Sequence, residues 1–270
     1  MPGIHAETQK ASEPRVIAVD WSGDLTGGAR TIWLCEIAGG EVVRLESGRS
    51  RQQVVEELIR GALANPSLVV GLDFAFAFPR WFHERLGVFD SGALWKHVAQ
   101  NGEEWLRACN APFWGKPGRT KPAIPAEFRR TEAAAAGRDG AQPKSVFQVG
   151  GAGAVGTGSI RGMPFLLRLR DAGFSVWPFD APALPMVVEI YPRILTGAVV
   201  KSNGMARATY LATRHAHLTR AIMSLGANNE DAFDALVSAL AMAAHAGEFS
   251  QLTRDEVDQV EGRIWMPDGQ

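Results

Sequence analysis

The chain of 270 residues is nearly neutral, with 28 Lys and Arg residues against 29 Asp and Glu residues and a net charge of −1. Because 46% of its residues are hydrophobic, it can bury a substantial core, which excludes wholesale disorder and a collagen-like repeat. The even charge balance disfavours strong non-specific binding to nucleic acid, since proteins that hold nucleic acid mainly by charge are usually basic.

The first third of the chain predicts strand, strand, strand, helix and strand in that order. Residues 51–64 carry apolar residues at helical spacing. The continuous apolar run at 67–76 predicts a strand buried on both faces, and the helix before it predicts that this strand lies parallel to its neighbour. Three short apolar runs with glycine-rich turns between them predict an antiparallel meander, at 16–20, 31–37 and 41–47.

The remaining two thirds of the chain predict an inserted region followed by more α/β structure. A segment rich in proline and glycine at 110–125 predicts a long loop, and long loops in compact domains are often functional. We therefore expect one domain over 15–268 with an insertion at about 79–163. The other predicted elements are helices at 79–86, 91–107, 126–136, 164–172, 204–225 and 229–247, and strands at 145–149, 174–179 and 185–192.

The cellular location is expected to be the cytoplasm. The two cysteines are too few for a disulfide framework or a cysteine zinc cluster, which favours a reducing compartment. The sequence contains no run of about 18 apolar residues that could cross a membrane. Residues 1–14 lack an apolar signal region and predict a disordered tail.

Acidic residues stand at the ends of predicted strands and on one predicted helix. Asp20 ends the first strand, Asp73 ends the buried fourth strand, and Glu189 lies in a later strand. Asp231 and Asp234 are three residues apart in the helix DAFDALVSALAMAAH and therefore share one face. Because that helix is otherwise apolar and an unpaired buried charge is costly, its carboxylates need a compensating partner.

Oxygen ligands of this kind suit Mg²⁺ or Mn²⁺. Carboxylates at the ends of adjacent strands can converge at one sheet edge, where a helix can add two more. Two ions about 3.5–4 Å apart would then activate water and stabilise the leaving oxygen of a phosphodiester. Simpler roles stay open for each acid: a turn residue for the strand-end aspartates, a favourable charge in the first helical turn for Asp231, and a pair with Arg193 for Glu189.

The segments VIAVDWSG, VVGLDFAFAFP, VVEIYPR and DAFDALVSALAMA resemble the ribonuclease-H-like superfamily. More narrowly they resemble the "domain of unknown function 429" family of predicted ribonuclease-H-like nucleases, to which FRRTE at 128–132 and the block at 145–166 are also similar. The resemblance covers about 16–265. It implies a mixed five-stranded sheet in the order β-β-β-α-β-α-β-α, flanked by helices.

The same resemblance implies a metal-dependent phosphodiester hydrolase. The helix DAFDAL is similar to the last catalytic helix of Holliday-junction resolvases, which assigns metal binding to Asp231 and Asp234. Asp20 matches the first-strand acid, and Asp73 matches a position that is Glu in the resolvases. Glu189 has no clear counterpart there. Since the chain lacks the basic balance of the resolvases, its expected partner is either nucleic acid or a small phosphorylated ligand.

The glycine loop GAGAVG at 151–156 matches the G-x-G-x-x-G pattern of dinucleotide-binding proteins. Asp180 follows the loop at about the position of the acidic residue that binds the ribose of the dinucleotide in those proteins. Pro164 argues against that interpretation, because proline would break a helix begun at Gly156, so we expect the helix to start at Pro164. The loop is then either a surface connection or an anion-binding nest. The candidate ligand-binding residues there are Lys144, Ser145, Gly151, Gly153 and Thr157.

The segment at 115–144 is rich in Lys and Arg and contains aromatic side chains. It predicts either a path for nucleic acid, with phosphates on the cations and bases on the rings, or a solvated loop balanced by acids elsewhere. Within it, Arg129 or Arg130 is the candidate for binding a phosphate with two hydrogen bonds.

Two other functions remain open at this stage. An actin-like ATPase or sugar-kinase-type phosphotransferase shares this fold ancestry, and DWSGDLTGG is faintly similar to its first phosphate loop. That class duplicates the β-β-β-α-β unit, whereas this sequence shows one convincing copy. A non-catalytic module that binds a nucleotide or nucleic acid is the other possibility. The sequence leaves the oligomeric state open, a dimer included.

Overall fold

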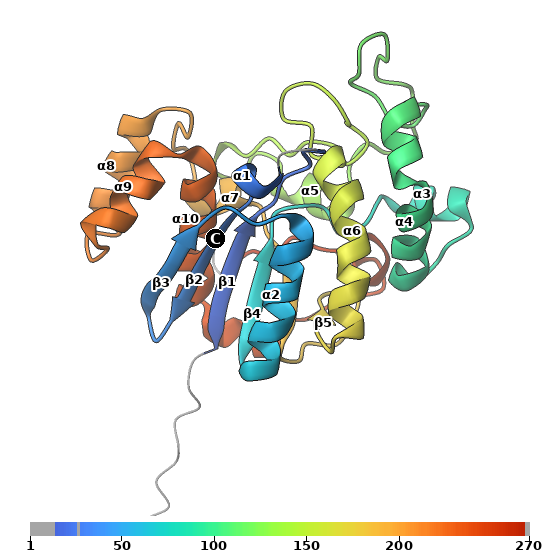
Figure 1. Cartoon of the computed structure of the whole chain (residues 1–270). Coiled ribbons are helices and arrows are strands. Elements are labelled where there is room, and N and C mark those ends of the chain that lie inside the picture. Colours follow the sequence, from blue (N-terminus) through green and yellow to red (C-terminus); the bar gives the residue numbers. More distant parts are fainter. Residues whose placement is uncertain (1–13, 26–27, 268–270) are drawn as a thin grey trace, which may run out of the picture.

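The computed structural model describes residues 14–25 and 28–267 (Figure 1). The predicted tail at 1–14 therefore lies outside the described residues except for Pro14. Within them, a six-stranded mixed sheet has the strand order β3-β2-β1-β4-β6-β5. The protein is thus α/β as expected, with six strands in the sheet rather than five. The strands are β1 Arg15–Asp20, β2 Trp33–Ala38, β3 Glu41–Glu46, β4 Leu68–Leu72, β5 Ser175–Val176 and β6 Met186–Glu189.

The sheet has an antiparallel half and a parallel half. Strands β1, β2 and β3 pair antiparallel, which confirms the predicted meander. Strand β4 pairs parallel with β1 and with β6, and β5 pairs parallel with β6. The helical crossover before β4 explains this change of direction, because parallel neighbours need a long connection. The carboxyl ends of β1, β4 and β6 consequently lie at one edge of the sheet.

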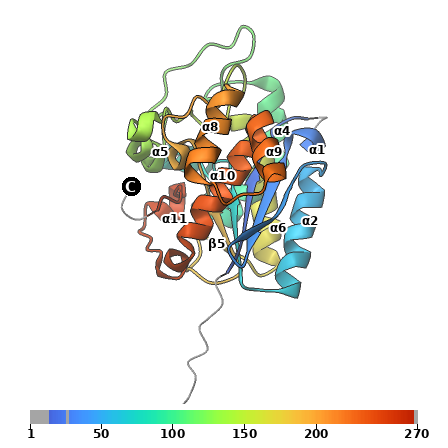
Figure 2. The same ribbon diagram turned by 90° about the vertical axis from the view of Figure 1, so that its left-hand side faces the viewer.

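Helices cover both faces of the sheet. Figure 1 shows α2 and α6 on one face, and Figure 2 shows α10 and α2 on opposite sides of the strands. No helix in the described ranges is long and apolar enough to cross a bilayer. The helices are α1 Gly28–Thr31, α2 Arg51–Ala64, α3 Arg80–Leu86, α4 Ser91–Ala108, α5 Arg130–Ala135, α6 Gly156–Asp171, α7 Pro192–Thr196, α8 Gly204–Arg214, α9 Arg220–Asn228, α10 Glu230–Ala244 and α11 Asp258–Glu261.

The hydrophobic core is split by the sheet into two layers. Val19 and Leu72 face the layer beneath α2 and α6, whereas Ala18 faces the layer beneath α10. Helix α10 approaches the sheet closely at Gly71, where a Cβ atom would lie 2.6 Å from the sulfur of Met242. Only glycine fits at that point, so the sequence of β4 helps to bring α10 against the strand ends.

Three predicted elements differ from the structure because of their neighbours. Strand β4 stops at Leu72 instead of running to residue 76, because the strands on either side of it, β1 and β6, end at the same level. Residues 145–149 are not a strand, and Gln148 makes only an isolated bridge to Trp114. The predicted helix at 204–225 is two helices, since a turn at 215–219 intervenes and Thr219 caps α9.

The prediction that a helix starts at Pro164 is wrong. Helix α6 begins at Gly156 and continues through Pro164. An interior proline forfeits one helical hydrogen bond and costs about 3 kcal/mol. The buried face of α6, which includes Ile160 and Leu166, offsets that cost by packing into the core. At Gly156 a Cβ atom would lie 2.2 Å from the carbonyl oxygen of Val146, so glycine is required where the helix begins.

Candidate functional site

Asp20 and Asp73 occupy equivalent positions at the ends of neighbouring parallel strands. Val19 of β1 lies opposite Leu72 of β4, and the Asp73 amide donates to the Val19 carbonyl at 3.1 Å. The next pair in this register is Asp20 and Asp73. Because side chains alternate along a strand and Val19 and Leu72 face α2 and α6, both aspartates point to the side of the sheet covered by α10.

Helix α10 brings Asp231 and Asp234 to the same side. Asn229 caps this helix, its Oδ1 accepting from the Ala232 amide at 2.8 Å. Asp231 in the first turn is half-buried, whereas Asp234 is only 7% exposed. The Oδ1 atom of Asp234 is buried and has no hydrogen-bond partner among the described residues. An unpartnered buried carboxylate oxygen is costly, so this atom is a place where a bound cation would stabilise the protein.

Lys201 lies among these aspartates, in the segment between α7 and α8. Its Nζ atom donates to Oδ2 of Asp234. Lys201 was not predicted from the sequence, because it lies in a loop 33 residues before its partner and no local pattern connects the two. Tyr191 was missed as well, although its position just after the β6 strand end was a signal that could have found it.

The carboxylates oppose one another's ionisation. Burial, together with the charges of Asp73, Asp234 and Asp231, raises the pKa of Asp20 well above its ordinary value. Burial and the charge of Asp234 raise the pKa of Asp73 to about 8. The pKa values of Asp231 and Asp234 are also raised, in both cases mainly by burial. The charge of Lys201 lowers all four pKa values, but each stays above the ordinary value for aspartate. The site therefore favours additional positive charge.

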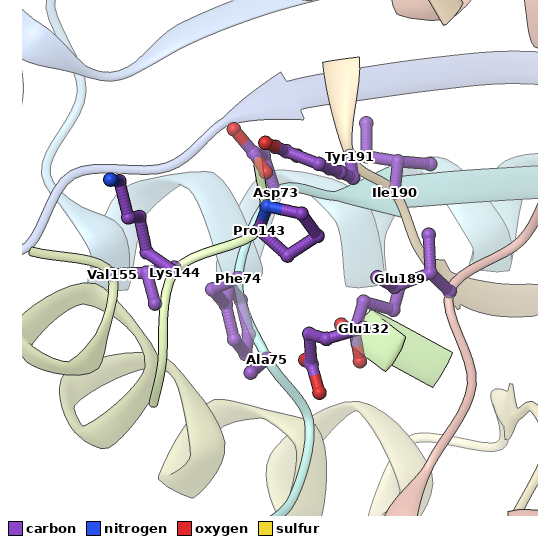
Figure 3. Close-up of a pocket in the computed structure, with 11 residues that line it drawn as sticks. Asp73, Phe74, Ala75, Glu132, Pro143, Lys144, Val155, Glu189, Ile190 and Tyr191 are labelled. Atoms are coloured by element: carbon purple, nitrogen blue, oxygen red, sulfur yellow. The ribbon is translucent and has the colours of Figure 1, made fainter. Parts of the chain in front are cut away.

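A small cavity lies beside Asp73 at the carboxyl ends of β4 and β6 (Figure 3). Its volume of about 40 Å³ exceeds the roughly 10–15 Å³ that a cavity of this kind needs to hold one water molecule. Figure 3 shows Asp73 and Tyr191 toward one end of the cavity and Glu132 and Glu189 toward the other. Burial and then the charge of Asp73 raise the pKa of Tyr191, so its phenol keeps its proton and can donate a hydrogen bond.

Glu189 faces the opposite side of the sheet from the aspartates. It pairs in register with Leu72 and therefore shares the Leu72 face. Its Oε2 atom accepts from Nη1 of Arg129 at 2.9 Å and from the Phe76 amide at 3.0 Å, and its Oε1 atom accepts from Nη2 of Arg129. The expected role of Glu189 as a metal ligand disagrees with this placement, because hydrogen bonds within the protein occupy both oxygens. Its partner is also Arg129 rather than Arg193.

Neither arginine proposed for phosphate binding points into the site. Arg129 is 1% exposed and pairs with both Glu132 and Glu189. The charges of these glutamates outweigh burial and raise the pKa of its guanidinium. Arg130 lies at the surface and pairs with Asp255 at 2.7 Å and with Asp258. The structure corrects both expectations for the same reason: carboxylates of the protein already form ion pairs with these two guanidinium groups.

Most candidate residues around the glycine loop have structural roles. Ser145 is buried, and its Oγ donates to the Glu127 carbonyl at 2.9 Å. Thr157 donates to the Val149 carbonyl at 3.0 Å. Gly151 and Gly153 adopt positive φ angles of 80° and 71° that favour glycine in tight turns. Lys144 is different: it is exposed and lines the cavity that contains Asp73.

The basic segment at 115–144 is partly neutralised within the protein. Lys121 pairs with Glu127, while Arg129 and Arg130 are paired as described above. Arg119 is exposed. This pairing lowers the positive charge that the segment offers to a long nucleic acid, although it leaves Lys144 available beside the cavity.

The donor chemistry of the site fits a hard divalent cation. Within the described residues, no group of three or more Asp, Glu, His or Cys side chains is gathered closely enough to hold a metal ion. An ion would therefore need the aspartates to draw together. Two observations favour it nonetheless: the ligands are carboxylate oxygens, and Asp234 Oδ1 has no hydrogen-bond partner among the described residues.

Comparison with known proteins gives no assignment. A scan against models of protein families, a search of curated proteins and a search of solved structures each found no match.

The raised pKa of Asp73 predicts that Asp73→Asn stabilises the metal-free protein. The folded protein holds a proton on Asp73 up to about pH 8, whereas the unfolded chain releases it near the ordinary value of 3.8. The unfolding free energy of the wild type therefore falls as the pH rises between these values. We expect Asp73→Asn to raise it by about 1–3 kcal/mol at pH 8 and by less at pH 5.

Urea denaturation in the presence of EDTA at both pH values measures this effect. The exposed substitution Glu256→Gln is the matched control and should change the unfolding free energy little at either pH. Equal pH dependence for the wild type and Asp73→Asn would show that Asp73 ionises normally in the folded protein.

Proposed function

We propose that the protein is a divalent-metal-dependent phosphodiester hydrolase with a ribonuclease-H-like fold. The observation that carries the proposal is the position of Asp20 and Asp73 at the ends of neighbouring strands, within electrostatic reach of Asp234, whose Oδ1 atom is buried without a partner among the described residues. The antiparallel β1-β2-β3 meander followed by parallel β4 and β6 supports the fold assignment, because the sequence resemblance implies that arrangement.

Asp20, Asp73 and Asp234 would hold Mg²⁺ or Mn²⁺, with Asp231 at the rim. A bound divalent cation lowers the pKa of water and stabilises negative charge on a phosphate or leaving oxygen. The backbones of Asp20 and Asp73 are held side by side, because Asp20 ends β1 and the Asp73 amide donates to the Val19 carbonyl. Asp234 comes from α10, and its side chain is the ligand that must leave or share its contact with Lys201.

In the proposed reaction, the oxygen of a water molecule forms a bond to phosphorus opposite the leaving oxygen, and this water gives up one proton to the solvent. The bond between phosphorus and that oxygen breaks, and the leaving oxygen takes up a proton. Tyr191 is placed to donate a hydrogen bond to the phosphate, since its phenol stays protonated beside Asp73. Lys144 at the rim of the cavity supplies a second contact of the kind that phosphate prefers.

The shape beside the site favours a small phosphorylated substrate or a short stretch of nucleic acid. A groove of about 520 Å³ is lined by Tyr191, Arg193, Lys201 and Glu230. Its volume lies within the range of about 300–1,000 Å³ that is typical of small-ligand sites. The internal pairing of Arg129 and Arg130 further disfavours a long electrostatic path.

A second candidate is a non-catalytic module that binds a phosphorylated ligand, which is favoured by the exposed Lys144 side chain at the cavity beside Asp73. The phosphotransferase alternative lacks such support, because the described chain forms one β-β-β-α-β unit rather than two.

A hydrolysis assay separates these functions. The full chain is incubated with bis(p-nitrophenyl) phosphate or a short oligonucleotide, with Mn²⁺, with Mg²⁺ or with EDTA. We expect product release that needs the metal and stops with EDTA. Turnover of ATP without diester cleavage would support the phosphotransferase, and ligand binding without turnover would support the binding module.

A further inference from the structure

The backbone of Lys201 is anchored to α8 and α9. Its carbonyl accepts from Nη1 of Arg207, a buried residue whose Nε atom also donates to the Ala227 carbonyl at 3.0 Å. Just after Lys201, the side chain of Asn203 caps α8 by accepting from the Met205 amide at 2.9 Å. Lys201 is therefore presented to the acidic site from a fixed backbone position, and its contact with Asp234 is part of the fold.

The Lys201 ammonium occupies one side of Asp234. Its Nζ atom binds Oδ2, and the two side chains are 18% and 10% exposed. The other oxygen of Asp234 is buried without a partner among the described residues. The charge of Lys201 also lowers the pKa of Asp20, Asp73 and Asp231, which places it within electrostatic reach of each acid.

We propose that this site holds one divalent cation on the Asp20–Asp73 side, and that the Lys201 ammonium supplies the second positive charge beside Asp234. The proposal rests on the proposed function and revises the expectation of two ions. In a two-metal site both the attacking and the leaving oxygen of the phosphate are stabilised by a cation. An ammonium carries a full positive charge and three N–H donors, so it can stabilise one of these oxygens itself.

Electrostatic repulsion is the reason that a second ion is excluded. An ion bound between Asp231 and Asp234 would lie close to Nζ of Lys201, and like charges repel strongly where water is scarce. The anchored backbone of Lys201 limits how far its ammonium can withdraw. The Asp20–Asp73 side has two carboxylates on neighbouring strands, and Asp234 Oδ1 remains available to join them.

Counting bound Mn²⁺ tests this inference directly. The full chain is brought to equilibrium with Mn²⁺ by dialysis, and the bound ions per chain are counted by electron paramagnetic resonance of the free metal. We expect one ion for the wild type and for Lys201→Arg, and two for Lys201→Met. Lys96→Met removes an exposed lysine on α4 and should behave like the wild type.

The outcomes separate this inference from the proposed function. Two ions per wild-type chain would overturn the role of Lys201 and leave a metal-dependent hydrolase intact. An unchanged count in Lys201→Met would do the same. If no folded variant binds Mn²⁺, the proposed function fails and this inference fails with it. Circular dichroism verifies folding, and Lys201→Gln provides a second neutral variant if Lys201→Met does not fold.

Discussion

The substitution Asp20→Asn is expected to lower the rate of metal-dependent phosphodiester hydrolysis by about 10³-fold. Asp20 follows the last registered pair of β1 and β4, Val19 and Leu72, and the charges of Asp73, Asp234 and Asp231 all act on its carboxyl group, which places it within the acidic site. A divalent cation contributes several kcal/mol of transition-state stabilisation, and about 4 kcal/mol corresponds to 10³ in rate. The measurement is the initial rate at an Mn²⁺ concentration that just saturates the wild type, followed by an Mn²⁺ titration of the variant that separates weaker metal binding from slower catalysis.

The control for this experiment is Asp171→Asn, which removes an exposed carboxylate at the end of α6. Its rate should stay within about twofold of the wild type, as most surface substitutions have small effects. A rate for Asp20→Asn that matches the control would mean that Asp20 has a structural role at the strand end and takes no part in the reaction.

The substitution Arg129→Met is expected to lower the unfolding free energy by about 3–5 kcal/mol, because it leaves buried carboxylates without a partner. Arg129 donates to Glu132 through Nε at 2.8 Å and to Glu189 through Nη1 at 2.9 Å. Burial already raises the pKa of Glu132 although Arg129 opposes it. Urea denaturation at pH 7 measures the loss. Since a typical domain has only about 5–15 kcal/mol of stability, this variant should be near the limit of folding.

Two further variants distinguish the buried pair from a loss of arginine packing. Arg107→Met removes an exposed arginine of α4 that pairs only with the exposed Glu104 in the described residues, and it should cost about 0–1 kcal/mol. Combining Arg129→Met with Glu132→Gln and Glu189→Gln removes the charges together and should recover much of the lost stability. If the triple variant is as unstable as Arg129→Met, the carboxylates are not the cause.

Local sequence patterns predicted the elements that build the site. The apolar runs and glycine turns of β1 to β3, the helical spacing of α2 and the apolar run of β4 each reflect contacts between residues close in the chain. The parallel pairing of β4 followed from its helical crossover. That pairing is sufficient to bring Asp20 beside Asp73, and the spacing of Asp231 and Asp234 follows from α10.

The remaining features depend on contacts that local patterns do not reveal. Glu189 differs from Asp73 by one position of register, and a shift of one residue moves a strand side chain to the other face of the sheet. Pro164 lies inside α6 because the tertiary packing of that helix outweighs its local preference. Lys201 reaches Asp234 only through the fold of the loop and two helices between them.

The most direct test of the account is a calorimetric titration of Mn²⁺ into the wild type and into the double variant Asp20→Asn/Asp234→Asn. The account predicts binding to the wild type and no detectable binding to the double variant, with both proteins folded. Binding of equal strength to both proteins would place the metal elsewhere. No binding to either protein, even with a phosphodiester ligand present, would contradict the metal-dependent mechanism and leave the aspartates with a structural role.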